Sequence, residues 1–263
     1  MTTLKEFNHY GEELEKLLML RTAPIAVKML EKEADIPKEA IRPKRDHGYH
    51  LAQCQAFAMT RRKRETIAML KEDNWCWAPL IGYGLVEPLD EKTISPMIYI
   101  VENMEAAKKI AEHFPRFEHS KYIGIISAPL STTSFKPDLV LIYSNTAQLR
   151  SMLLSIKFKE GHLVKSEFDP IDSCVYSVVP AIKDGVYRIT LPDPGEYERA
   201  MADEGEIILS VPPDKLGELV EGLRFFEKMK MGYRHFNMQM TPDFPQPDFY
   251  KDLFRMWGLD VAE

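Results

Sequence analysis

The stretch PDLVLIYSNTAQLRSMLLSI, residues 137–156, decides the fold of this 263-residue chain. Its first part, 137–144, begins at a proline and is then mostly apolar. A short apolar run bounded by such a residue is typical of a buried strand. Asn145 can then cap a helix, in which apolar residues recur at the i, i+3, i+4 and i+7 spacing of one face. A strand that passes directly into an amphipathic helix predicts a protein of the α/β or α+β class.

The same two patterns continue on both sides of this stretch. Apolar runs predict further strands at 24–30, 65–70, 121–129, 162–168, 186–191 and 206–211. Helical spacing predicts helices over 3–20, 50–60 and 103–114, and a last one that starts at 212. We therefore expect one compact domain over 1–263, built from mixed sheets and helices. We expect the tail 232–263 to wrap the surface, where its aromatic residues from Phe249 to Trp257 could dock as a short helix.

The order of these elements also predicts an internal duplication, with repeats at roughly 24–90 and 137–185. In the first repeat, a strand is followed by a helix with Cys54 and Gln55, a second strand, and an apolar segment that Cys76 opens. In the second repeat, Gln148 takes the place of Gln55, and Cys174 opens the apolar segment. Two similar halves would place the functional site in the cleft between them.

The composition restricts the class of protein. Hydrophobic residues make up 45% and charged residues 28%, which is typical of globular chains, and the net charge of −6 argues against a nucleic-acid partner. No apolar run is long enough for a membrane span, and the N-terminus does not resemble a signal peptide. An odd number of cysteines without such a signal favours a reducing cytoplasm. The sequence leaves open whether the protein forms a homo-oligomer.

The three cysteines, Cys54, Cys76 and Cys174, carry the chemistry that the sequence suggests. Thiolates bind soft metal ions and iron–sulfur clusters, and they also act as nucleophiles. A helix over 50–60 would put His50 on the same face as Cys54, one turn away, as a fourth ligand. The alternative is that the cysteines are ordinary core residues, since free cysteine is among the most buried residue types.

Four further residues are candidates for binding a cofactor. Gln55 and Gln148 lie near predicted helix N-termini, where an anionic ligand is favoured and an amide can orient it. Trp75 and Tyr83 flank Cys76 and could line a pocket for a planar ligand, although such aromatics usually lie in the core. The basic run 61–64 could bind an anion, but a solvated turn is the more usual structure for such a run.

An ordered set of short segments resembles a known family, the prokaryotic domain-of-unknown-function family number 169. The segments are 24–28, Cys54-Gln55, 74–76, 82–85, 137–140, 146–148, Cys174 and 206–212. The resemblance covers most of residues 3–226 and implies a cytoplasmic prokaryotic protein. It supports the fold boundaries more than any mechanism. The chain departs from the family at 61–64, where a glycine-containing turn is expected.

Three functions follow as hypotheses. The first is a cofactor-binding protein, in which the three cysteines hold a metal ion or an iron–sulfur cluster, or the two glutamines orient a small anionic ligand. If this protein is an enzyme, redox or metal-assisted chemistry on a small molecule is the expected class. The second is a non-catalytic sensor or carrier of a small molecule, with cysteines that only pack. The third is an interaction subunit that uses the C-terminal tail.

Overall fold

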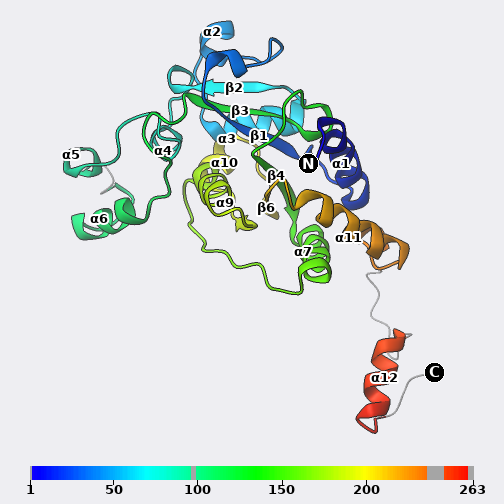
Figure 1. Ribbon diagram of the computed structural model, residues 1–263. Helices are drawn as coiled ribbons and strands as arrows, with labels where there is room; N and C mark the ends of the chain where they lie inside the picture. The colour runs from blue at the N-terminus through cyan, green and yellow to red at the C-terminus, as the bar shows by residue number, and fades with distance from the viewer. Residues whose placement is uncertain (1, 96–98, 236–245, 260–263) are drawn as a thin grey trace.

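A computed structural model describes residues 2–95, 99–235 and 246–259 and shows a mixed α/β protein around one six-stranded sheet (Figure 1). The strand order is β2-β3-β1-β4-β6-β5, and every pairing is antiparallel. The strands are β1 (Ile25–Leu30), β2 (Ile67–Leu70), β3 (Gly124–Pro129), β4 (Leu139–Asn145), β5 (Arg188–Thr190) and β6 (Glu206–Val211). The predicted class is therefore confirmed.

The sheet is built from two halves with the same topology. From the central β1–β4 pair outward, the first half runs β1-β3-β2 and the second half runs β4-β6-β5. In each half the first strand along the chain lies at the centre and the second lies at the edge. The edge strand of the second half, β5, however, lies outside the predicted repeat 137–185 and follows Cys174, whereas β2 precedes Cys76. The duplication itself stays a prediction, because the segment 162–168, expected to match the strand at 65–70, is irregular.

Helices cover both faces of the sheet, so the side chains on both faces of its central strands are buried. One face packs against α1 (Leu4–Leu18), α7 (Thr146–Glu160) and α11 (Leu216–Lys228). The other packs against α3 (Gln53–Ala58), α4 (Trp77–Gly82), α8 (Ser173–Tyr176) and α9 (Val179–Asp184), with α10 (Pro194–Arg199) beside α3 (Figure 1).

Alternate residues of each central strand point to opposite faces, as the pleat of a strand dictates. In β4, Val140 and Ile142 join the α1–α7–α11 core, whereas Leu139, Leu141 and Tyr143 join the core on the other face. Burial on both faces explains why this stretch reads as an unbroken apolar run rather than an alternating one.

Three short helices lie outside this layered body. They are α2 (Pro43–His47), α5 (Glu91–Ile94) and α6 (Met104–His113), the last two packing on each other around Ile94 and Ala107. The C-terminal helix α12 (Asp248–Met256) stands apart from the sheet in Figure 1 and buries none of its residues. The predicted helix near Phe249 thus exists, but it does not dock on the body. The sequence also predicts that the tail 232–263 wraps the surface. Part of this tail, 236–245 and 260–263, lies outside the described residues.

Most predicted elements are confirmed within a few residues. The helix predicted at 50–60 is present as α3, but it begins at Gln53, because Leu51 is paired with Asn74 in an extended bridge. The segment 162–168 forms no strand. None of the helices in the described ranges is both long and apolar enough to span a membrane.

Candidate functional site

All three cysteines line one pocket of about 420 Å³, which we call the cysteine pocket. The short helices on one face of the sheet supply them: Cys54 is the second residue of α3, Cys76 is the N-cap of α4, and Cys174 lies in α8. Both ends of α10 and its N-cap residue also line the pocket. The lining is completed by Ala52, Gln53, Trp75, Trp77, Ile100, Ile171, Asp172, Asp193, Pro194, Gly195, Glu198 and Arg199.

Backbone pairing brings the first two cysteines together. The N–H of Leu51 donates to the carbonyl of Asp73 (3.0 Å), and the N–H of Trp75 donates to the carbonyl of Leu51 (3.2 Å). This bridge holds the segment before α4 beside the segment before α3. As a result Cys76 packs against the small apolar cluster that contains Cys54, although 22 positions separate them in the chain.

Burial keeps the thiols protonated. It raises the pKa of Cys54 to about 12, helped by the nearby carboxylates of Glu196 and Asp193 and opposed by Arg199. Burial also raises the pKa of Cys76, and it raises that of Cys174 well above the ordinary value. The ionised form of Cys76 or Cys54 would raise the pKa of Cys174 further. The pocket therefore presents neutral sulfur rather than a reactive thiolate.

A buried carboxyl pair adjoins the pocket, and one of its members, Asp193, lines it. The Ser173 hydroxyl oxygen is 2.5 Å from Oε1 of Glu196 and 3.0 Å from Oδ2 of Asp193. The Ser173 hydroxyl has one proton, so it donates to one of these two carboxyl oxygens at a time. Burial raises the pKa of Glu196 to about 7, and the hydrogen bond from Ser173 opposes this rise. Burial likewise raises the pKa of Asp172 in the pocket wall to about 7.

The basic run 61–64 is partly buried: Arg61 belongs to the protein interior, whereas Lys63 and Arg64 are exposed. The Arg61 side chain is 1% exposed, donates to both carboxylate oxygens of Glu206 (2.7 and 3.0 Å), and stacks on the Tyr143 ring at 4.1 Å. Arg64 bonds Glu15 at the surface. The expectation of a solvated turn is wrong for Arg61, because the π-type turn of 59–63 directs it into the protein.

The other predicted site residues have separate places. His50 is exposed and precedes α3, so it does not share a helix face with Cys54, and it is not among the residues that line the pocket. Trp75 lines the pocket. Tyr83 is fully buried, and its hydroxyl donates to the backbone carbonyl of Cys174 (2.8 Å), so it supports α8 from the core.

The two predicted glutamines occupy equivalent positions, the third residue of α3 and of α7. Each side-chain oxygen accepts the N–H of its N-cap residue, at 2.9 Å for Gln55 and 2.8 Å for Gln148. Gln55 also accepts the indole N–H of Trp75 (3.4 Å). The amide of Gln148 donates to the carbonyl of Leu18 (2.8 Å) and lies away from the cysteine pocket. Both amides are thus engaged in structural hydrogen bonds.

The sequence reasoning missed Gln53, Asp193 and Arg199. Gln53 lines the pocket and is 1% exposed, and neither its amide nitrogen nor its oxygen has a hydrogen-bond partner among the described residues. The signal for it was present, because Gln53 flanks Cys54 on the other side from Gln55. Asp193 is the N-cap and Arg199 the last residue of α10, a helix that the apolar pattern did not indicate.

The cysteine pocket does not form a ready metal site. Within the ranges that the structure describes, no group of three or more His, Cys, Asp and Glu side chains is arranged so that it could hold a metal ion. The three thiols share one pocket, but a metal would require them to move and to lose their protons.

An apolar pocket of about 630 Å³ adjoins the cysteine pocket. The two share Trp77 and Ile100, and the apolar one is otherwise lined by Ile81, Leu89, Tyr99 and by Lys92 and Thr93 of α5. The segment from α5 to the start of α6 therefore forms part of the wall of this apolar pocket. A ligand larger than the cysteine pocket has room to extend in this direction.

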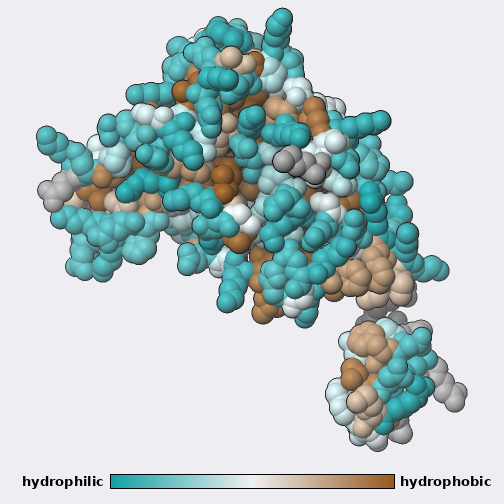
Figure 2. All heavy atoms as spheres, in the orientation of Figure 1, coloured by the Kyte–Doolittle hydropathy of each residue, from teal (hydrophilic) through white to brown (hydrophobic). Residues whose placement is uncertain are grey.

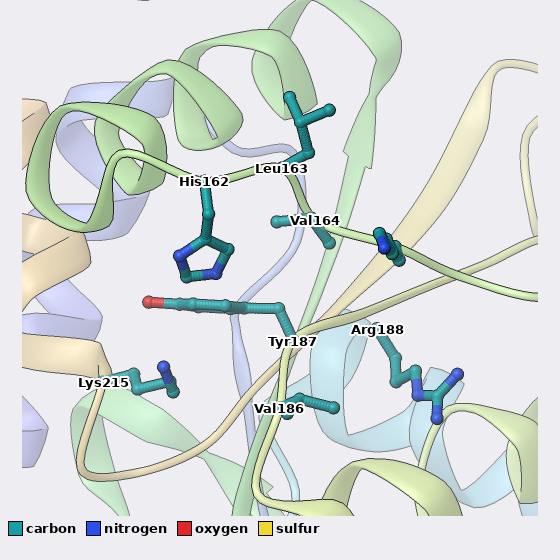
Figure 3. Close-up of a pocket in the computed structure, with 8 residues that line it drawn as sticks. His162, Leu163, Val164, Val186, Tyr187, Arg188 and Lys215 are labelled. Carbon is teal, nitrogen blue, oxygen red and sulfur yellow. The ribbon is translucent and has the colours of Figure 1, made fainter.

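A third pocket, of about 570 Å³, lies away from these two pockets and is lined mainly by residues 162–165 and 186–188 (Figure 3). His162 and Lys215 lie on opposite sides of the Tyr187 ring, and Arg188 points away from that ring. Lys215 and His162 both contact Glu160 (3.1 and 2.9 Å), so the Lys215 ammonium group has a carboxylate partner. As a candidate functional site this pocket is weaker than the cysteine pocket, which has three cysteines and an amide without a partner among the described residues.

The layered sheet and the cysteine pocket define a mixed α/β protein with its site among short helices on one face. The chain belongs to domain-of-unknown-function family 169, described as uncharacterised ArCR, whose sequence pattern matches residues 13–222. An uncharacterised protein of Methanocaldococcus jannaschii is 23% identical over 233 residues, which cover 86% of this chain and 97% of that protein. No solved structure matches the chain.

Proposed function

We propose that this protein binds a small organic molecule in the cysteine pocket and acts as a sensor or carrier. The observation that carries the proposal is the convergence, on one pocket, of three cysteines distant in sequence and a buried amide without a partner. Ligand pockets are typically apolar and aromatic concavities with a few polar groups that orient the ligand, and the cysteine pocket has this composition.

The state of the thiols favours binding over catalysis. A nucleophilic cysteine needs a lowered pKa or an adjacent base. Burial and the nearby carboxylates shift Cys54 and Cys174 in the opposite direction. Neutral sulfur is a soft, polarisable surface that packs well against a ring. A reducing cytoplasm, in which free thiols persist, is the compartment that suits this function.

The test is a thermal-shift screen of several hundred small metabolites. We expect at least one compound to stabilise the wild-type protein and the control variant Leu163→Phe, whose residue lies in the third pocket and is 72% exposed. The same compound should not stabilise Cys76→Phe, which fills the cysteine pocket. A screen without any stabilising compound that depends on residue 76 would contradict the proposal.

A metal ion or iron–sulfur cluster is the second candidate, and the shared pocket of the three cysteines is the observation that favours it. Binding would convert protonated thiols into thiolate ligands and release their protons. Anaerobic purification followed by metal analysis and an absorption spectrum decides between the two. Stoichiometric metal that is lost in Cys54→Ser would favour the cluster, whereas a colourless, metal-free protein would favour the organic ligand.

A further inference from the structure

Gln53 is the least explained polar residue of the described structure. Its side chain is almost completely buried, and both of its polar atoms lack a hydrogen-bond partner among the described residues. A buried amide without partners is costly, and buried polar groups in native proteins are nearly always satisfied. A leucine or methionine at this position would not bury an unsatisfied amide. The amide is therefore best explained by a ligand that satisfies it.

The neighbouring glutamine, Gln55, shows that the lack of hydrogen-bond partners is particular to Gln53 and is not shared by the other glutamine of this helix. Gln55 lies on the same helix and has its oxygen occupied by the N–H groups of Ala52 and Trp75. Gln53, on the other side of Cys54, lines the cysteine pocket. Of the two glutamines that flank Cys54, Gln55 bonds to the local structure, whereas both polar side-chain atoms of Gln53 lack a partner among the described residues.

We infer that the occupant is a planar heterocycle with a lactam edge, paired with the amide of Gln53; this rests on the proposed function. A primary amide presents a donor and an acceptor side by side, and a lactam presents the complementary acceptor and donor. The ring is expected to be flat because Trp75 and Trp77 line the same pocket. The Arg199 guanidinium lies over the Trp75 ring at 5.0 Å, so one face of that indole is already covered.

The size and charge of the pocket agree with such a ligand. About 420 Å³ is within the range of pockets that hold single small molecules. The wall carries Asp172, Asp193 and Glu198 against a single cation, Arg199, which favours a neutral ring over an anionic one. Apolar substituents on the ring have room beyond Trp77, in the adjoining apolar pocket.

The probe is lumichrome, a fluorescent ring system with lactam N–H groups, and its matched control is 1,3-dimethyllumichrome, in which both N–H groups are methylated. Fluorescence titration measures their affinities for the wild type, Gln53→Met and Gln148→Met. Gln148 is the control residue because it is a buried glutamine with partners, outside the pocket. We expect lumichrome to bind the wild type and Gln148→Met equally, and to bind Gln53→Met at least tenfold more weakly.

We also expect methylation of the probe to weaken its binding to the wild type at least tenfold. In the free protein, Gln148→Met should lower the melting temperature, whereas Gln53→Met should leave it unchanged or raise it. Equal binding of the two probes, equal binding by Gln53→Met, or a melting temperature lowered by Gln53→Met would each overturn the inference. So would a failure of lumichrome to bind the wild type. The proposed function would survive these results if the metabolite screen gave a compound that depends on residue 76.

Discussion

Arg61 shows how a single residue can be mistaken for surface when only its neighbours in sequence are considered. It stands in a run of four basic residues, 61–64, which is the usual pattern of a solvated segment. Its partner Glu206 lies 145 positions away, and no local pattern connects the two. Gln53 is the same kind of case, because its burial depends on the walls that α8 and α10 build around it.

The Arg61–Glu206 pair gives the first prediction. Arg61→Met should lower the free energy of unfolding by about 3 kcal/mol, because Glu206, whose side chain is 9% exposed, then keeps only the more distant Arg62, at 4.0 Å, as a counter-charge. The double variant Arg61→Met/Glu206→Met should cost less than the single one, since no charge is left buried. Urea denaturation measures both. A double variant that is less stable than the single variant would contradict this account.

The thiols give the second prediction. With its pKa raised from 9.0 to about 12, Cys54 has about a thousandfold less thiolate near neutral pH than an ordinary cysteine. Iodoacetamide at pH 7.5 should therefore label Cys54 and Cys174 very slowly, and Cys76, the least buried of the three, first. Mass spectrometry of peptides follows the rates, and the same reaction in denaturant is the control. Rapid labelling of Cys54 in the native protein would show that its thiol is not shielded.

The elements that build the pocket are short and depend on close packing. The helices α4 and α8 approach each other at Gly82, where an added Cβ would lie 2.5 Å from a methyl carbon of Val175. Only a residue without a Cβ allows this approach, which brings the Cys76 and Cys174 segments to one pocket. Helices this short are marginal by themselves and are stabilised by tertiary contacts. This is why the sequence pattern predicted α1, α7 and α11 better than α8 or α10.

Gly82→Ala is the prediction that belongs to these helices. It should destabilise the protein by about 1–3 kcal/mol, because the added methyl group overpacks the contact with Val175. Adding Val175→Ala should recover part of the loss by making room. Gly205→Ala is the control, since a Cβ at that position meets nothing within 4 Å. Thermal unfolding measures all the variants, and equal melting temperatures for Gly82→Ala and the control would contradict the close approach.

The molecule as a whole combines a rigid layered body with exposed apolar surface at its margins. Figure 2 shows hydrophobic side chains gathered near the C-terminal end of α11. Phe158 and Phe225 stack there with ring centroids 4.3 Å apart, and both are more than one-third exposed. An interaction surface at this end is compatible with the third hypothesis, although the predicted contact residues of α12 lie on a separate helix.

The fourth prediction concerns the stability of the whole protein against pH. The native state holds a proton on Glu196 up to about pH 7, whereas the unfolded chain releases it near the ordinary value of 4.5. Between these values the native state binds more protons, so the free energy of unfolding falls as the pH rises. Glu196 faces Asp193, Ser173, Tyr143 and Arg61, and burial is the largest cause of its raised pKa.

Glu196→Gln removes this titration and keeps the shape of the side chain. Relative to the wild type, its free energy of unfolding should therefore rise between pH 4.5 and 7, by up to roughly 3 kcal/mol. Urea denaturation at a series of pH values gives the difference between the two proteins. A difference that is constant over this range would mean that Glu196 titrates normally in the native state.

The sequence by itself determined the class of fold, the position of all but one predicted strand, the long amphipathic helices and the capping role of Asn145. These depend on residues close together in the chain, through the pleat, the helical period and the backbone groups of a helix start. Only the tertiary structure decided which residues meet in the cysteine pocket, that Arg61 is buried, and that Gln53 rather than Gln55 has an unpartnered amide. These depend on distant segments that local patterns do not connect, and the burial of a side chain follows from what packs over it.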